Sequence, residues 1–292
     1  MHHSDSATVT TVDTLAKLLD VCGELRASEQ VDERAVTGCS FDSRAVSAGD
    51  VFFCKGAAFK PAFLSMALDA GAVAFVCEES LVESLEPLAQ ESGAAMLVVD
   101  SVRTAMALLP PEVYDRPDHD VKIVGITGTK GKTTTTHMIK TILEAAGKKV
   151  GMIGTTGTVI GDKVTPTMNT TPESWQLHQA FAQMADSGCQ YMIMEVSSQG
   201  IKMHRVDGIT FDYGIFTNIS PDHIGPDEHA DFAEYLYCKS RLLNMCRIGL
   251  VNRNDSHFED IVRDADCELY TYSVTEERGG LHGSGESGAD FT

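Results

Sequence analysis

The sequence predicts an α/β protein: a small N-terminal α/β domain, followed by a P-loop domain with a doubly wound, mostly parallel sheet. Two observations lead to this fold class. Short apolar runs alternate with helix-length segments through most of the 292 residues, which is the pattern of parallel strands joined by helices. Near the middle, an apolar strand pattern over residues 121–126 runs into Gly128, Gly131, Lys132 and Thr133 before a helical pattern begins.

The N-terminal part predicts a compact α/β domain. After a polar start and a short helix over residues 14–19, strand and helix patterns alternate. They cover residues 36–41, 49–54, 61–70, 72–77, 81–91, 94–99 and 102–109. Pro110 and Pro111, with the polar residues up to 120, form the best candidate linker. We therefore expect one domain over residues 1–117 and a second over residues 118–292.

The segment after residues 121–126 has the layout of a phosphate-binding loop. In such a loop, backbone N–H groups and a helix N-terminus face an anion, a lysine reaches the outer phosphates and a hydroxyl holds Mg²⁺. Lys132 and Thr133 take the last two places, although Ile126 stands where the common pattern has its first glycine. The expected nucleotide-binding residues are Gly128, Thr129, Lys130, Gly131, Lys132, Thr133 and Thr134. The pattern predicts a nucleotide site.

The downstream pattern predicts the rest of the second domain. Strands are expected over residues 149–155, 190–196, 211–217, 249–252 and 268–273, and helices over residues 133–146, 173–187 and 231–246. The glycine-rich tail after residue 277 contains no core-forming run. Ligands of doubly wound sheets bind at the carboxyl ends of the strands, where Glu195 ends an apolar run. A carboxylate there is suited to holding Mg²⁺ against phosphates.

His223 and Lys239 are weaker candidates when taken alone. His223 follows a strand pattern, and Lys239 lies on a predicted helix one turn after Tyr235. A loop histidine is more often a hydrogen-bonded surface residue, and a helical lysine is more often solvated. Their pattern in the chain leaves both readings open.

Composition excludes some classes of function. The net charge of −19 argues against a nucleic-acid partner, because a broad basic surface is incompatible with it. The eight cysteines contain no C-x-x-C pair, which favours reduced core thiols. Neither a charged-then-apolar leader nor an apolar run of membrane-spanning length is present. We therefore expect a soluble, cytoplasmic protein.

Several separated motifs stand in a fixed order along the chain. They are Asp42-Ser43-Arg44, Gly49-Asp50, Gly125-Ile-Thr-Gly-Thr-Lys-Gly-Lys-Thr133, Asn169-Thr-Thr-Pro172, Glu195-Val-Ser-Ser198, His204-Arg-Val-Asp-Gly208, Phe216-Thr-Asn218, Asp222-His223 and Lys239. Together they resemble the Mur ligase family, and most closely its branch that adds the third residue of the peptidoglycan stem peptide. The resemblance runs from about residue 36 to 252.

The resemblance implies an ATP-dependent ligase of peptidoglycan biosynthesis. ATP would phosphorylate a carboxylate of UDP-N-acetylmuramoyl-L-alanyl-D-glutamate, and the amine of a diamino acid would attack the acyl phosphate to form an amide. The partners would be these small molecules.

The resemblance also implies roles for single residues. Lys132 would offset phosphate charge, Thr133 and Glu195 match the ligands of one Mg²⁺, and His223 with Glu195 matches those of a second. Lys239 matches the lysine that the family carboxylates with CO₂, and as a carbamate it would bind metal. Ser43 matches a uridine-site serine. The muramoyl-peptide would contact Asn169, Thr170, Thr171, Ser197 and Arg205.

The chain departs from the family pattern in several places. Lys130 replaces an asparagine, Gln199 a histidine and Met203 a glutamine. The family's C-terminal domain, which selects the incoming amino acid, has no counterpart in these residues. We therefore expect a fragment that binds nucleotide better than it turns over.

Two other functions compete with this interpretation. One is a ligase resembling folylpolyglutamate synthetase, which shares the phosphate loop, but the Asp42-Ser43-Arg44 domain counts against it because folate ligases begin with the ATP domain. The other is a non-catalytic module that binds nucleotide or UDP-muramoyl-peptide without ligating.

Overall fold

The chain forms two compact units in the computed structural model, residues 1–117 and residues 118–292. The structure describes residues 12–14, 35–226, 228–273 and 281–283. The helix expected over residues 14–19 lies outside the described residues except for Thr14, as does Cys22. Each unit is a separate α/β body with its own sheet.

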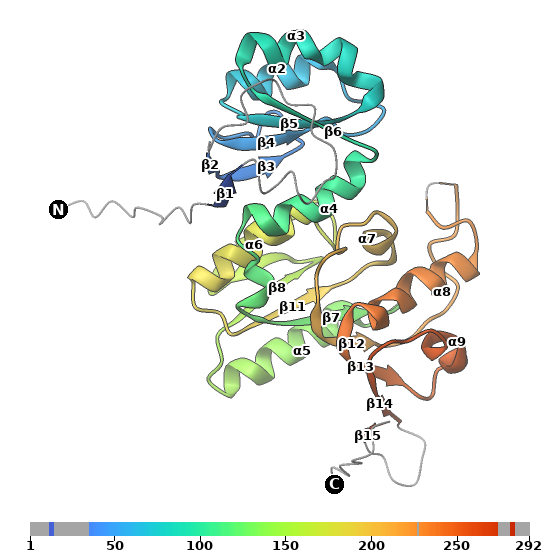
Figure 1. The fold of residues 1–292 in the computed structure, drawn as a ribbon. Helices are drawn as coiled ribbons and strands as arrows, with labels where there is room; N and C mark the ends of the chain where they lie inside the picture. Colours follow the sequence, from blue (N-terminus) through green and yellow to red (C-terminus); the bar gives the residue numbers. More distant parts are fainter. Residues whose placement is uncertain (1–11, 15–34, 227, 274–280, 284–292) are drawn as a thin grey trace, which may run out of the picture. The chain divides into compact units, whose positions relative to one another are not determined.

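A four-stranded parallel sheet forms the centre of the first unit (Figure 1). The strands, in spatial order, are β3 (Gly38–Ser40), β4 (Asp50–Phe53), β5 (Ala74–Glu78) and β6 (Ala95–Val99). The described α-helices are α2 (Pro61–Asp69), α3 (Val82–Ser92) and α4 (Val102–Val113). β1 (Val12–Thr14) and β2 (Ala35–Val36) form a separate antiparallel pair. Phe52 and Phe75 from the sheet and Leu64 and Leu85 from the helices share one buried core, as the alternating pattern predicts.

The prediction of a linker at Pro110 and Pro111 is wrong, because both lie inside α4 and are buried. A proline has a backbone angle that suits a helix, and its cost is the missing N–H donor. Here the proline carbonyls still accept hydrogen bonds: Tyr114 N donates to Pro110 O at 3.1 Å, and Arg116 N donates to Pro111 O. Burial of the proline rings therefore offsets the lost donors, and the helix continues to Val113.

The second unit is built on a nine-stranded sheet in the order β10–β9–β8–β11–β7–β12–β13–β14–β15. Six neighbouring strands are parallel, namely β8 (Val150–Gly154), β11 (Tyr191–Glu195), β7 (Lys122–Thr127), β12 (Phe211–Phe216), β13 (Cys246–Asn252) and β14 (Glu268–Tyr272). Antiparallel strands extend both edges, namely β9 (Gly157–Ile160), β10 (Lys163–Thr165) and β15 (Leu281–Gly283). Because the central strands are parallel, their carboxyl ends share one edge of the sheet.

Helices cover both faces of this sheet, as expected for a doubly wound fold. They are α5 (Lys132–Ala145), α6 (Ser174–Asp186), α7 (Ser198–Lys202), α8 (Phe232–Ser240) and α9 (Phe258–Val262). Figure 1 shows α6 and α5 on opposite sides of β8, β11 and β7. α5 packs against Val124 and Ile126, whereas α6 and α8 contribute to the larger core on the other face. The fold class predicted from the sequence is confirmed.

Two further element predictions need correction. The helix expected over residues 231–246 ends at Ser240, where a 3-10 turn (Arg241–Asn244) begins, and Cys246 already opens β13. Cys246 belongs to the sheet because it pairs with Phe211 on β12. The hairpin of β9 and β10 was not predicted, because no element was expected between the strand over residues 149–155 and the helix over residues 173–187.

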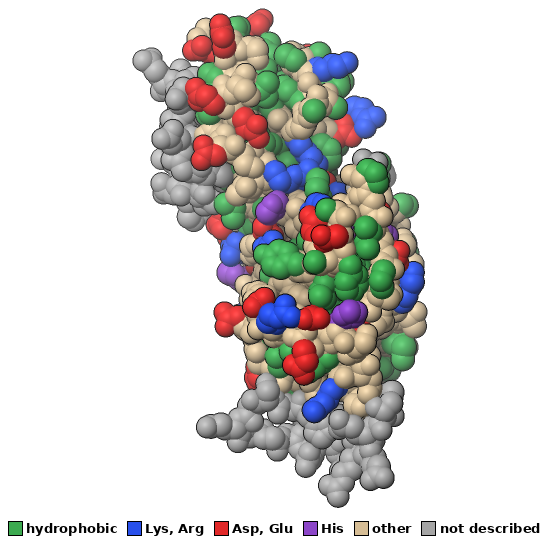
Figure 2. All heavy atoms as spheres, turned by 90° about the vertical axis from the view of Figure 1, so that its right-hand side faces the viewer, with side chains coloured by type: hydrophobic (Ala, Val, Ile, Leu, Met, Phe, Trp, Pro, Cys, Tyr) green, Lys and Arg blue, Asp and Glu red, His purple; other side chains and the backbone are tan. Residues whose placement is uncertain are grey.

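Surface charge, cysteine state and helix length in the described residues relate to the predictions made from composition. On the face shown in Figure 2, Lys and Arg side chains lie in small groups among Asp and Glu side chains, without a continuous basic surface. All seven described cysteines are free thiols, and six of them are buried, so the prediction of reduced core thiols is confirmed for these residues. Among the helices that the structure describes, none has the length and apolar character needed to cross a membrane.

Candidate active site

The predicted phosphate loop connects β7 to α5 at the carboxyl edge of the large sheet. Gly128 has a φ of 141°, and a Cβ added there would lie 2.0 Å from Thr217 Oγ1, so only glycine fits this position. Gly131 is the N-cap of α5 and also has a left-handed backbone, with φ at 87°. The free N–H groups of the first helical turn, at Lys132, Thr133 and Thr134, therefore face the loop.

The loop after β12 holds the phosphate loop in shape. β12 pairs with β7 in register, so Thr217 and Asn218 follow directly beside the phosphate loop. Thr129 N donates to Asn218 O at 2.8 Å, and Thr217 Oγ1 and Asn218 Nδ2 both donate to Lys130 O at 2.9 Å. The motif around Phe216 predicted no role for this Thr-Asn pair. The pair follows β12, the strand beside β7, and this position predicts its contact with the phosphate loop.

Lys132 folds back over the loop that precedes it. Its Nζ donates to Gly128 O at 2.8 Å and to Thr129 O at 3.3 Å. Burial lowers the pKa of Lys132, while the charge of Glu195 acts in the opposite direction. The ammonium group is thus held at the phosphate loop itself, next to the carboxylate predicted to bind metal.

Glu195, the last residue of β11, is buried and faces the first turn of α5. Thr133 Oγ1 lies 3.0 Å from both carboxylate oxygens, and Thr155 N donates to Oε1 at 2.9 Å. No Lys, Arg or His pairs with Glu195 within 4.0 Å among the residues that the structure describes. A hydroxyl and an amide hold this buried carboxylate without offsetting its negative charge, so a cation bound beside it would be stabilised. Thr155 is a site residue that the sequence analysis missed.

Lys239 lies on α8 with its side chain buried beneath the phosphate loop. Its Nζ donates to Gly128 O at 2.9 Å, the same carbonyl that Lys132 contacts, and it lies 4.7 Å from the centre of the Tyr235 ring. Burial, followed by the charge of Lys132, lowers the pKa of Lys239 to about 7. The surface reading of this lysine is therefore wrong, since the amine is enclosed and half neutral near neutral pH.

His223 lies in the loop between β12 and α8, at the side of the phosphate loop. Its Nδ1 is 2.7 Å from Glu228 Oε1, and the neighbouring Asp222 accepts from Lys130 Nζ at 3.1 Å. This bond to Lys130 lowers the pKa of Asp222. Within the described part of the chain, His223 has no hydrogen bond or ion pair with Glu195 or Lys239, and no group of three His, Cys, Asp or Glu residues could hold a metal. The second metal site therefore stays a prediction.

The residues predicted to hold the muramoyl-peptide gather around Thr171. Thr171 Oγ1 donates to Glu195 O at 3.0 Å and accepts from Ser197 N at 2.9 Å. Arg205 Nη1 donates to Thr171 O, and its Nε donates to Glu173 Oε1, both at 3.2 Å. Thr170 Oγ1 lies 3.2 Å from Thr155 Oγ1, and Asn169 is exposed. The structure thus joins this loop to the carboxyl end of β11.

Arg205 has a protein partner in addition to its predicted contact with the muramoyl-peptide. The structure pairs it with Glu173 in a nearly buried contact. Glu173 also caps α6. The guanidinium group has five donors, so Nη2 is left for a further acceptor while two donors fix the loop. The Glu173 partner could not be read from spacing, because 32 residues separate the two.

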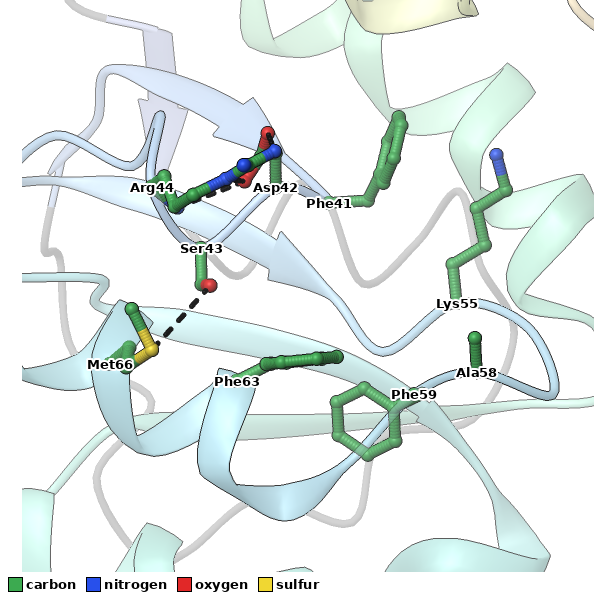
Figure 3. Close-up of a pocket in the computed structure, with 9 residues that line it drawn as sticks. All are labelled: Phe41, Asp42, Ser43, Arg44, Lys55, Ala58, Phe59, Phe63 and Met66. Carbon is green, nitrogen blue, oxygen red and sulfur yellow. Dashed lines mark hydrogen bonds and ion pairs between the residues drawn. The ribbon is translucent and has the colours of Figure 1, made fainter.

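A pocket of about 440 Å³ in the first unit contains Ser43. Figure 3 shows Asp42 and Arg44 forming a double ion pair on one side, with Phe63 and Met66 of α2 on the other. The Ser43 hydroxyl points toward Met66 Sδ at 4.0 Å. Phe59 adds a second ring, and Lys55 Nζ lies 4.2 Å above the ring of Phe41. Aromatic faces beside polar groups suit a planar heterocycle, a feature that the motif alone did not predict.

Comparisons with known proteins identify the family of the chain. The Mur ligase middle domain model matches residues 126–287. A UDP-N-acetylmuramyl-tripeptide synthetase of Latilactobacillus sakei is 44% identical over 230 residues, which are 77% of this chain and 43% of that protein. A UDP-N-acetylmuramoyl-L-alanyl-D-glutamate–2,6-diaminopimelate ligase of Clostridium acetobutylicum is 36% identical over 88% of this chain and 50% of its own length. The chain spans about half the length of the curated relatives it matches.

A solved structure shows the same fold. A UDP-N-acetylmuramoyl-L-alanyl-D-glutamate–2,6-diaminopimelate ligase superimposes with a TM-score of 0.74 at 23% identity, covering 96% of this chain and 59% of that one. The family model covers more than half of the chain, including the phosphate loop from residue 126, Glu195 and Lys239. On these grounds the chain belongs to the Mur ligase family.

Proposed function

We propose that the protein is an ATP-dependent ligase that adds a diamino acid to UDP-N-acetylmuramoyl-L-alanyl-D-glutamate. The observation that carries the proposal is the bond between Thr133 and Glu195 at the N-terminus of α5, which makes the phosphate loop a site for a metal-bound nucleotide. Relatives at 35–44% identity that are named as synthetases or ligases of this type support the substrate. The proposal covers three points: turnover by the whole protein, the use of ATP, and the muramoyl substrate.

The phosphate loop binds the triphosphate of ATP in this proposal. The free backbone N–H groups of Lys132, Thr133 and Thr134 face the phosphates in this proposal, Lys130 and Lys132 offset their charge, and Gly131 lets the backbone approach closely. Thr133 and Glu195 hold Mg²⁺, which needs few protein ligands because phosphate oxygens supply others. A Mg²⁺ ion held by these two residues would supply positive charge next to the phosphates, which would let a substrate carboxylate approach.

The remaining predicted residues hold the acceptor and complete the cation site. Ser43 contacts the uridine group, and the muramoyl-peptide lies along Asn169, Thr170, Thr171, Ser197 and Arg205. His223 joins Glu195 at a second metal. The neutral amine of Lys239 would hold CO₂ as a carbamate, with release of one proton, and the resulting anion would serve as a ligand for cations. The reaction requires two anions to come together, and Arg205 and the bound cations would supply the opposing charge.

Binding and phosphate release test the proposal together. We expect the chain to bind ATP with Mg²⁺ and UDP-N-acetylmuramoyl-L-alanyl-D-glutamate, and phosphate release to require both of them and a diamino acid. Calorimetry measures binding, and a coupled phosphate assay with a panel of diamino acids measures turnover. Binding of a folate substrate in place of the muramoyl-dipeptide would contradict the proposal.

Replacing Arg205 with alanine is expected to weaken binding of the muramoyl-dipeptide by about tenfold or more, since a charged hydrogen bond contributes about 1.5–3 kcal/mol. ATP binding should change much less, because Arg205 contacts the Thr171 loop and not the phosphate loop. Calorimetry with each ligand measures the difference. Arg241→Ala is the matched control, as Arg241 lies 3.9 Å from Asp207 and, among the described residues, has no hydrogen bond or ion pair with Thr171 or Glu173. An effect confined to ATP would refute the placement of Arg205.

A further inference from the structure

The turn between β8 and β9 places Thr155 against Glu195. β8 and β11 are parallel neighbours with Ile153 paired to Met194, so Gly154 lies opposite Glu195. A Cβ on Gly154 would be 2.3 Å from Glu195 Oε1, which means that the carboxylate occupies the space a side chain would need. The carboxylate therefore extends across β8 to the next residue, Thr155, whose N–H donates to Oε1 at 2.9 Å.

The hydroxyl of Thr155 has two partners in addition to this N–H contact. Oγ1 lies 3.3 Å from Glu195 Oε2 and 3.2 Å from Thr170 Oγ1. An ionised carboxylate only accepts hydrogen bonds, and a hydroxyl has one hydrogen to donate. The Thr155 hydrogen therefore goes to Glu195, and Thr155 accepts from Thr170. The result is a directed chain of hydrogen bonds from Thr170 through Thr155 to Glu195.

The hairpin of β9 and β10 is what returns Thr170 to this place. Its strands pair Gly157 through Ile160 with β8 and then with β10, so the chain comes back alongside the β8 turn. Thr167 Oγ1 donates to Gly154 O at 3.3 Å, which fixes the returning segment at the same turn. Thr155 is thus the hydroxyl at which the Glu195 carboxylate and the Asn169–Thr171 loop meet.

We propose that Thr155 is a positioning residue that couples the metal-binding carboxylate to the loop that holds the muramoyl-peptide. This inference rests on the proposed function. A ligand that fixes Thr170 orients the Thr155 hydroxyl toward Glu195, and a cation on Glu195 orders the same chain from the other end. Each ligand then binds more tightly in the presence of the other, and by linkage the two effects are equal.

The coupling is measured by binding on the chain itself. The affinity for UDP-N-acetylmuramoyl-L-alanyl-D-glutamate is determined by calorimetry with and without the non-hydrolysed ATP analogue AMP-PNP plus Mg²⁺. The wild-type chain should show a mutual gain of about fivefold. Thr155→Val keeps the N–H and the shape but loses the hydroxyl, so this gain should fall to about one. Thr155→Ser should restore it.

Thr156→Val provides the matched control. Thr156 is the next residue in the same turn, and its hydroxyl lies 3.5 Å from His137 Nε2 rather than at Glu195. It should keep the wild-type gain. A wild-type chain that binds both ligands without mutual gain, or a Thr155→Val variant that keeps the gain, overturns the role of Thr155. A wild-type chain that binds neither ligand overturns the proposed function as well, so the two failures differ.

Discussion

Replacing Lys132 with alanine is expected to reduce ATP turnover by about a thousandfold. Loss of one preorganised donor to a charge that develops in the transition state costs about 10²–10³ in rate, and Lys132 carries a full charge in addition to its hydrogen bonds. In the structure its Nζ sits 2.8 Å from Gly128 O at the centre of the phosphate loop. The change should also weaken ATP binding, which calorimetry measures on the chain.

Lys140→Ala is the control for this change. Lys140 lies on the same helix, α5, but its ammonium pairs with Glu144 one turn later. It should leave ATP binding and phosphate release at wild-type values. Wild-type turnover in Lys132→Ala would rule out the assignment of residues 128–134 as the nucleotide site.

Replacing Lys239 with methionine is expected to abolish ligase activity, and added bicarbonate should not restore it. The amine is buried, bonded to Gly128 O and held over Tyr235, so it is enclosed at the nucleotide site. Its lowered pKa of about 7 leaves much of it neutral at neutral pH, and the neutral amine is the form that reacts with CO₂. A carbamate carbon signal should appear in NMR spectra of the wild-type chain with ¹³C-labelled bicarbonate and be missing in Lys239→Met.

The same lysine gives a pH dependence of stability with a defined sign. Its pKa is lowered on folding from 10.5 to about 7, mainly by burial. Between these values the unfolded chain binds the proton and the folded chain does not, so stability rises with pH across this window. Lys239→Met should lack that rise in the free energy of unfolding, measured by urea titration at a series of pH values. Parallel curves for the two proteins would show that Lys239 is solvated.

The sequence predicted the elements whose periodicity is strong. The parallel strands β7, β11 and β12 are apolar runs bounded by loops, and each was expected within one residue at either end. The rule that parallel strands end at one edge was enough to predict that Glu195 lies near Thr133. That proximity needs only the order of the elements and no knowledge of side-chain packing.

The rest depended on contacts between distant segments. The hairpin of β9 and β10 is short and exposed in its second strand, so it leaves little apolar alternation in the sequence. Without the hairpin, Thr155 could not be connected to Thr170. Burial of Lys239 depends on α8 packing under the phosphate loop, and helical spacing gives that residue no apolar signature. Pairs such as Arg205 with Glu173 are set by the tertiary structure alone.

Two lysines at the phosphate loop have a consequence for how fast anionic substrates arrive. Lys130 and Lys132 form a local positive centre, yet the whole chain carries a net charge of −19. At low ionic strength the long-range field repels an approaching anion, and the lysines attract it only at close range. Salt shortens the reach of the field to about 10 Å at ~0.1 M. Association rate constants should therefore rise with ionic strength before they fall, the reverse of the usual trend for a cationic receptor.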